Sequence, residues 1–201
     1  EAKVDVVIVG GGHAGVNLAC WLAKTKDGPS YILLERNRLL CKWRDNRWDG
    51  FKLNTPMKYS RLHGQTDSLP DVKMGRPIAE DIQRWDDHIK KMRLNYRELC
   101  LVESVSVHPT RKDLFSVRTK SEDDGPKEYV AKNVVVCCGE YDRVKVPANL
   151  SKPLDPSIRQ FTSDQFHSSK DLKSGGVLLV GSGQSGVQIA KILVEEGRDV
   201  Y

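Results

Sequence analysis

The chain has 201 residues, 39% hydrophobic and 29% charged, which is ordinary for a soluble globular protein. This length allows one full core and part of a second. The net charge of +5 is spread along the chain without a nucleic-acid motif, so composition argues against nucleic-acid binding. No apolar run approaches the roughly 18 residues of a membrane span. The five cysteines show neither C-x-x-C nor metal-ligand spacing, which favours a reducing compartment, and we expect the cytoplasm.

The N-terminal segment alternates strand, glycine turn, helix and strand. Residues 4–9 form an apolar run that ends in glycines, and residues 13–24 carry leucines four positions apart, as on one face of a helix. Residues 31–35 are the second expected strand. Such a unit crosses over right-handed onto a parallel sheet, so the sequence predicts an α/β fold.

Residues 36–76 show no sustained periodicity and are rich in aromatic and basic side chains, which is typical of a functional loop region. A helix start follows at Pro77, with acidic Glu80 and Asp81 where the helix dipole favours them. Its apolar residues recur at three- and four-residue steps, which predicts one buried stripe. The stripe consists of Ile78, Ile82, Trp85, Ile89 and Met92. We therefore assign Trp85 to the core.

Alternating apolar and polar residues predict three short antiparallel strands, at 99–107, 114–119 and 127–131. A buried parallel strand is expected next at 133–138, ending at Gly139. Its cysteine at position 138 is expected to be a buried structural thiol.

A second strand–turn–helix unit opens near the C-terminus, after a Pro- and Ser-rich connection. A strand is expected at 177–180, a helix at 184–196 and a further strand from Asp199. A strand cut off after three residues cannot complete a sheet, and the chain starts with Glu1. We therefore expect a fragment of a longer polypeptide that is inactive by itself.

The first glycine turn fits G-x-G-x-x-G through Gly10, Gly12 and Gly15. Gly10 permits the tight turn, Gly12 lets the backbone approach a pyrophosphate, and Gly15 lets the helix pack closely on the sheet. The pyrophosphate is favoured by the free N–H groups and dipole of the helix N-terminus. Glu35, at the end of the next strand, is placed to accept hydrogen bonds from a ribose diol. This context predicts a dinucleotide site.

The same pattern returns at Gly181, Gly183 and Gly186, again between an apolar strand and a helix. Two such motifs indicate two dinucleotides, one held tightly and one exchanging. Hydride transfer from a nicotinamide to a flavin is the chemistry that needs both.

The chain resembles the group B flavin monooxygenases along its whole length. Residues 40–44 (Leu-Cys-Lys-Trp-Arg) and 47–56 (Arg-Trp-Asp-Gly-Phe-Lys-Leu-Asn-Thr-Pro) are similar to the family segment Gly-Gly-x-Trp-Arg followed by Tyr-Asp-x-x-x-Leu-x-Thr-Pro, with cysteine and lysine in place of the two glycines. Phe161 and His167 match the family fingerprint F-x-G-x-x-x-H-x-x-x-W in register, while Ser163 and Asp171 depart from it.

The resemblance implies a glutathione-reductase-type Rossmann FAD domain with a three-stranded antiparallel insert, then the start of a second Rossmann NAD(P)H domain. The expected division is residues 1–165 for FAD, 166–175 as a linker and 176–201 for NAD(P)H. His167 is expected to orient the linker. By resemblance, the FAD-binding residues are Gly10, Gly12, Gly15, Glu35, Trp43, Arg44, Val105 and Gly139, the NADPH-binding residues are Gly181, Gly183, Gln184, Ser185 and Gly186, and Asn54 and Thr55 lie near the flavin.

The implied activity is that of an FAD-dependent, NADPH-reduced monooxygenase, in which a flavin hydroperoxide passes one oxygen atom of O2 to a small organic substrate. No acid–base side chain is compulsory for it, and none is predicted. Two alternatives stay open: a flavoprotein reductase passing electrons to a disulfide, quinone or iron–sulfur partner, and a non-catalytic flavin-binding redox sensor. No metal site is expected, and a homo-oligomer is left open.

Overall fold

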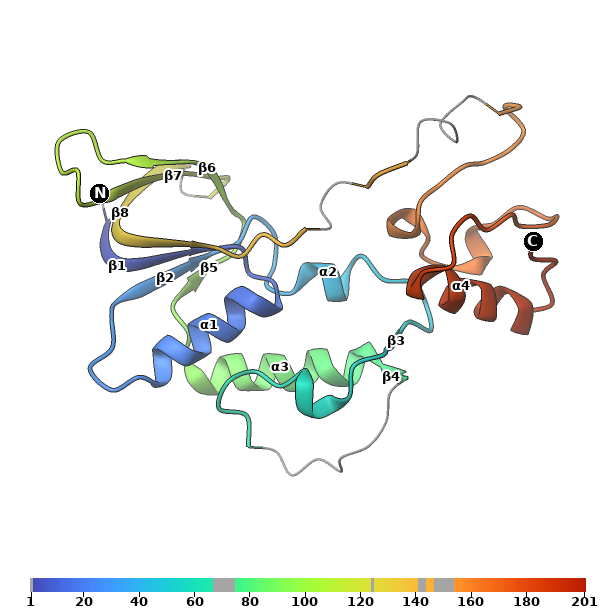
Figure 1. The fold of residues 1–201 in the computed structure, drawn as a ribbon, viewed down its shortest axis with the longest axis horizontal. Coiled ribbons are helices and arrows are strands. Elements are labelled where there is room, and N and C mark those ends of the chain that lie inside the picture. Colours follow the sequence, from blue (N-terminus) through green and yellow to red (C-terminus); the bar gives the residue numbers. More distant parts are fainter. Residues whose placement is uncertain (1, 67–74, 124, 141–143, 147–153) are drawn as a thin grey trace.

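A computed structural model describes residues 2–66, 75–123, 125–140, 144–146 and 154–201. Six strands form one sheet in the order β5-β2-β1-β8-β7-β6, in which β1 pairs in parallel with both β2 and β8 (Figure 1). Its strands are β1 Ala2–Val9, β2 Tyr31–Leu34, β5 Tyr96–Arg97, β6 Cys100–Val107, β7 Phe115–Ser121 and β8 Gly125–Val136. A separate antiparallel pair joins β3 Lys52–Leu53 to β4 Arg76–Pro77. The expected α/β class is confirmed.

The described residues form four α-helices, of which α1 and α3 lie together on one face of the sheet (Figure 1). Their bounds are α1 His13–Lys24, α2 Cys41–Arg44, α3 Ile78–Met92 and α4 Gln184–Glu195, with short 3-10 helices at Met57–Tyr59, Ser163–Gln165 and Ser169–Asp171. The predicted bounds of the first helix agree with the structure. Within the described residues, no helix has the length and apolar character needed to cross a membrane.

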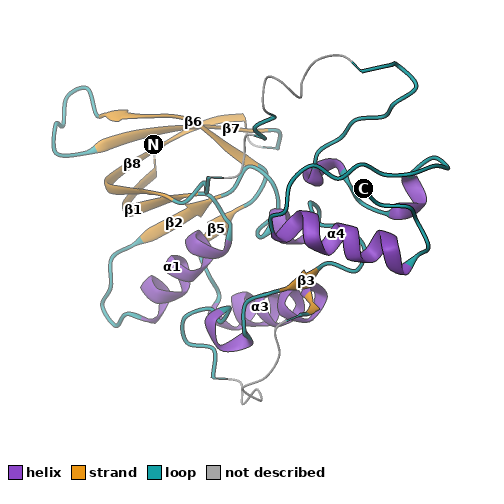
Figure 2. Ribbon diagram, turned by 45° about the vertical axis from the view of Figure 1, so that its right-hand side comes forward, coloured by secondary structure: helices purple, strands orange, loops and turns teal. Residues whose placement is uncertain are grey.

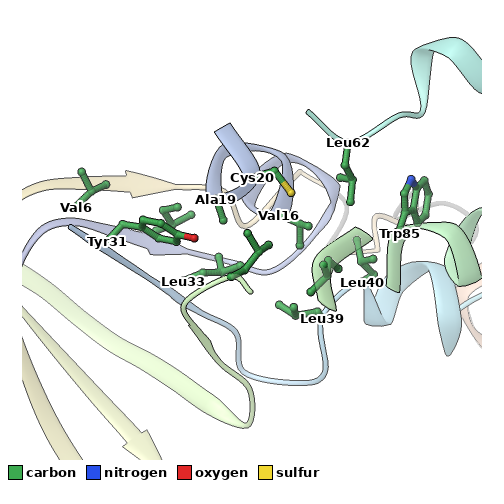
Figure 3. Packing of buried hydrophobic residues seen from close by; sticks show 13 residues of the cluster. Val6, Val16, Ala19, Cys20, Tyr31, Leu33, Leu39, Leu40, Leu62 and Trp85 are labelled. Atoms are coloured by element: carbon green, nitrogen blue, oxygen red, sulfur yellow. The ribbon is translucent and has the colours of Figure 1, made fainter. Parts of the chain in front are cut away.

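The main core lies between α1, α3 and the sheet (Figure 3). Val16 of α1 and Leu33 of β2 are fully buried there, and Trp85 of α3 closes the cluster at one end. The predicted stripe of α3 is confirmed, since its five residues all pack in or against this cluster.

Asp81 lies in the first turn of α3, as predicted, and it is also the centre of a buried group of charges. Its carboxylate is fully buried, 2.7 Å from the guanidinium Nη2 of Arg76 and 3.4 Å from Nη1 of Arg84. Ser60 also donates its hydroxyl to this carboxylate at 3.3 Å. A buried charge has to be paired, and here the pairing joins α3 to β4 and to the loop before it.

The third antiparallel strand and the following parallel strand are one continuous element, β8, and not two. Its first half pairs antiparallel with β7 up to Ala131, while its second half pairs in parallel with β1 up to Val136. Figure 1 shows the strand curving between these neighbours. The expectation that 133–138 is buried is also wrong. The pairing of β7 with β8 ends at Ala131, so the later residues of β8 have no neighbouring strand on that side among the described residues. Val136 is 68% exposed.

The C-terminal unit forms α4 as predicted, but residues 177–180 are not a regular strand. Val177 makes only an isolated parallel bridge to Val200, so there is a single pair where a strand would need several. A separate hydrophobic cluster nevertheless packs around α4, with Ile189 and Leu193 against Phe166. Trp48 completes this cluster and so belongs to the core of the C-terminal unit.

Asp5 ties β1 to its neighbours and gives the fold an acid-sensitive contact. Its carboxylate accepts hydrogen bonds from the amide and hydroxyl of Ser30, at 3.0 and 2.7 Å, and lies 2.9 Å from Nζ of Lys132. Its hydrogen bond with Lys132, followed by those with Ser30, holds the pKa of this carboxyl well below its ordinary value.

We expect Asp5→Asn to destabilise the protein at neutral pH but not in strong acid. A carboxyl with a depressed folded-state pKa contributes stability above its unfolded pKa of about 3.9, and loses that contribution as the pH falls further. Urea midpoints of wild type and variant at neutral pH and at successively lower pH check this, and the two curves should converge on acidification. A difference that is independent of pH would contradict it.

Candidate dinucleotide-binding sites

The first glycine turn is built so tightly that two of its glycines admit no side chain. Gly10 has φ +105°, and a Cβ there would lie 2.6 Å from the carbonyl oxygen of Cys137. A Cβ on Gly15 would collide with the carbonyl oxygen of Gly10. These contacts are the close turn and close helix packing that the motif predicts.

Gly12 differs, because a Cβ at this position would meet nothing within 4 Å. It is the N-cap of α1, and among the described residues no side chain caps this helix end. Open space therefore lies in front of N–H groups that point out of the helix, which is the arrangement that receives a phosphate. The residues present fit the pyrophosphate of a dinucleotide.

Glu35 lies against the turn and holds it in shape. Its Oε2 accepts a hydrogen bond from the amide of Gly11 at 2.6 Å, and Oε1 accepts one from the amide of Asn37 at 2.8 Å. The residue is 8% exposed. Each carboxylate oxygen can accept more than one hydrogen bond, so a ribose hydroxyl can be added to these contacts. Glu35 is thus placed at the glycine turn, and its contact with a ribose stays a prediction.

A groove of about 420 Å³ opens immediately beyond Glu35. Asn37, Arg38, Cys41, Asp45, Asn46 and Leu99 line it. Sequence reasoning missed this groove, because Leu99 reaches it from a distant segment through a hydrogen bond of its amide to the Asn37 carbonyl at 3.1 Å. The only signal in the sequence was the position of Asn37 and Arg38, two and three residues after the acid.

Helix α2, which carries Trp43 and Arg44, begins against the glycine turn. The amide of Leu40 donates to the carbonyl of Gly11 at 2.8 Å. Arg44 points its guanidinium to Asp86 of α3, and donates Nε–H to the Leu39 carbonyl at 2.9 Å. The hydrogen bond to Asp86 raises the pKa of Arg44. Arg44 therefore joins α2 to α3 through its ion pair with Asp86, and its role beside a flavin stays a prediction.

Arg47 is a second residue that sequence reasoning missed. Its guanidinium carbon lies 4.8 Å from the ring centre of Trp43 and 5.1 Å from that of Phe51. Burial lowers the pKa of Arg47. The only signal in the sequence was a basic residue inside an aromatic segment, which is also what a solvated surface would show.

Val105 and Gly139 fall in different surroundings. Cys100, at the start of β6, donates its amide to the Glu35 carbonyl at 2.8 Å, and Val105 lies five residues further along this outer strand. At about 3.3 Å per residue, that is about 16 Å from the acid, so the structure does not bring Val105 to the turn. Gly139 follows β8 with φ +74° and open space at its Cβ. Cys138 beside it is exposed, so the buried thiol expected there is wrong.

The second glycine turn repeats the geometry of the first. Gly181 has φ +115°, a Cβ on Gly186 would collide with the Gly181 carbonyl oxygen, and a Cβ on Gly183 would meet nothing within 4 Å. Gly183 is the N-cap of α4, and Gln184 and Ser185 lie exposed in its first turn. The second turn therefore has the geometry that the motif predicts, and phosphate binding there stays a prediction.

The N-terminal part of the chain meets the C-terminal unit at the segment after Trp48, which packs on α4. Figure 2 shows β3, which belongs to this segment, beside α4. The Asp49 amide donates to the His167 carbonyl at 2.8 Å, and Asn54 Oδ1 accepts from Nε2 of Gln188 at 3.2 Å. Thr55 is exposed. Asn54 and His167 are thus both at the junction with the C-terminal unit, while contact of Asn54 or Thr55 with a flavin stays a prediction.

A family model described as pyridine nucleotide-disulphide oxidoreductase matches residues 4–201, which include both glycine turns. The chain belongs to this family. It is 33% identical over 193 residues to "Uncharacterized oxidoreductase CzcO" of Bacillus subtilis strain 168, covering 96% of this chain and 52% of that relative. The chain therefore spans about half the length of this curated relative.

Solved structures share the fold across the whole chain. A variant flavin monooxygenase from Stenotrophomonas maltophilia matches with a TM-score of 0.78 at 22% identity, covering 100% of this chain and 56% of the other. Bacillithiol disulfide reductase from Bacillus cereus matches with a TM-score of 0.75 at 20% identity, covering 98% of this chain and 57% of the other. The resemblance to the flavin monooxygenases is supported, and the fold is shared by monooxygenases and reductases.

Proposed function

We propose that the chain forms the FAD-binding module and the start of the NADPH-binding module of a flavin-dependent monooxygenase. The observation that carries the proposal is the matched pair of glycine turns, each with open space at its middle glycine and a helix N-terminus behind it. The proposed division keeps residues 1–165 for FAD, 166–175 as the linker and 176–201 for NADPH.

The residues around the first turn would hold FAD. The α1 N-terminus at Gly12 receives the pyrophosphate, and Glu35 receives the ribose. The groove beside Asn37, which Leu99 also lines, would continue the site toward the adenine. NADPH would bind in the same way at Gly183, with Gln184 and Ser185 in the first turn of α4.

Flavin chemistry would supply the oxidising step, inserting one oxygen atom of O2 into a small organic substrate in the cytoplasm. What the chain supplies is position: Asn54 is hydrogen-bonded to Gln188 of α4, the helix that begins at the second glycine turn. This segment is the part of the sequence most similar to the monooxygenases, which favours that class. A reductase remains the second candidate, because the fold is also that of a disulfide reductase.

The test begins with the visible spectrum of the purified full-length protein, followed by NADPH or NADH in air. We expect bound flavin that NADPH bleaches, and transfer of oxygen from isotopically labelled O2 into an amine, sulfide or ketone. Bleaching with all electrons recovered in peroxide, a disulfide or a quinone would favour the reductase. Bound flavin that neither nucleotide reduces would indicate a binding protein without turnover, and absence of flavin would refute the proposal.

A further inference from the structure

Gln188 makes a contact with the FAD-side segment that resembles the pairing of a β-strand. Its Oε1 accepts a hydrogen bond from the amide of Lys52 at 3.2 Å, and its Nε2 donates to the carbonyl of the same residue at 2.9 Å. Both backbone groups of Lys52 are therefore held by one side chain, 136 positions away in the sequence.

This contact uses the edge of β3 that β4 leaves open. Leu53, the next residue, directs its carbonyl the other way, where it accepts from the Gly75 amide at 2.8 Å beside β4. Successive residues of a strand face opposite edges, so Gln188 occupies the place of a third strand. The segment is thereby held from both sides.

The orientation of the Gln188 carboxamide in turn sets that of Asn54. Since the Lys52 carbonyl can only accept, the group facing it must be the Gln188 NH2, and this NH2 also reaches Asn54 at 3.2 Å. Asn54 therefore presents its oxygen to Gln188. Its own NH2 group is directed elsewhere and has no partner among the described residues.

Gln188 also lies one helical turn from the predicted nucleotide site, since α4 begins at Gln184. Trp48 anchors the same segment against α4, and a Cβ on Gly50 would lie 3.5 Å from the Ile192 side chain. A nucleotide that fixes the first turns of α4 therefore fixes the segment from Trp48 to Asn54 with them.

We propose that Gln188 is a positioning residue that couples pyridine-nucleotide binding at α4 to the placement of Lys52 and Asn54. The inference rests on the proposed function. Gln188 touches neither nucleotide nor flavin in this role. It sets the register of the segment and the direction of the Asn54 amide. Substituting Gln188 should therefore slow hydride transfer from NADPH to the flavin more than it weakens the binding of NADPH.

The test compares Gln188→Ala and Gln188→Glu with Lys191→Ala, a control on the exposed face of α4 whose ion-pair partner is the equally exposed Glu195. Glutamate keeps the size and can accept from the Lys52 amide, but it cannot donate to Lys52 or Asn54. In stopped-flow reduction by NADPH, both Gln188 variants should lose about 10- to 100-fold in limiting rate, with the apparent Kd for NADPH changed less than the rate.

A second readout is independent of flavin reduction. Hydrogen exchange of the backbone amides at 52–55 should slow when NADP+ binds to the wild type and to Lys191→Ala, and this response should vanish in Gln188→Ala. Gln188 variants with wild-type reduction rates and a retained exchange response would overturn the inference alone. If NADPH failed to reduce the wild-type flavin, the proposed function would fail, while the exchange response would still decide the coupling.

Discussion

Substituting Gly15 with alanine is expected to abolish flavin binding by preventing α1 from docking on the sheet. A Cβ there would occupy the position of the Gly10 carbonyl oxygen and also press on Leu33 at 3.3 Å. The obstacle is backbone, which cannot rotate away as a side chain would. Both the glycine turn and the packing of Val16 beneath it would have to open. Soluble expression, circular dichroism and bound flavin per polypeptide measure the result.

Gly12→Ala is the matched control in the same turn. A methyl group at Gly12 meets nothing in the protein, so the thermal midpoint should stay near that of the wild type. It would stand where the pyrophosphate approaches, and we expect FAD affinity to fall by about tenfold or more, about 1.4 kcal/mol. Equal loss of folding in both variants would contradict the assignment of different roles to the two glycines, as would full flavin binding by Gly15→Ala.

Replacing Trp85 with alanine should lower the free energy of unfolding by about 3–5 kcal/mol, the range for large aromatic residues in a core. Trp85 is 1% exposed, and its indole Nε1–H donates to the Ser60 carbonyl at 2.7 Å. Its ring also meets His13 edge-on at 5.2 Å between ring centres. The variant thus loses packing and a buried hydrogen bond together. Urea denaturation followed by circular dichroism gives the change.

Two further variants separate these contributions. Trp85→Phe keeps much of the packing but leaves the Ser60 carbonyl without the indole donor. It should therefore lower the free energy of unfolding less than Trp85→Ala does. Trp21→Ala removes a tryptophan from α1 that is 54% exposed and should change stability much less. Comparable losses for Trp21→Ala and Trp85→Ala would show that Trp85 is not the core residue described here.

Local patterns were sufficient for the glycine turns, for α1 and for the apolar stripe of α3, because periodicity and glycine spacing act over a few neighbouring residues. They failed where the partner is remote. The burial of Asp81 depends on Arg76 arriving from β4, and the exposure of Val136 depends on where β7 begins. No local pattern distinguishes such residues from an ordinary first-turn acid or a buried valine.

The candidate site divides in the same way. The glycines and Glu35 were predictable because one turn and the strand beside it bring them together. Leu99 and Gln188 were not, since each reaches its partner from a segment far along the chain. The contact of Val105 with the adenine stays a prediction, because the position of its strand depends on pairing with β7, which includes a register shift between Val102 and Ser104.

The continuity of β8 has a consequence for the order of folding. Asp5 and Ser30 are 25 positions apart, so β1 can pair with β2 early, whereas Asp5 and its β8 partner Asn133 are 128 positions apart. Contacts that close long loops form late, because the entropy of the chain opposes them. During synthesis on the ribosome, one edge of β1 therefore waits unpaired until the hairpin of β7 and β8 has emerged. That edge is where a nascent chain of this protein is most exposed to association with another.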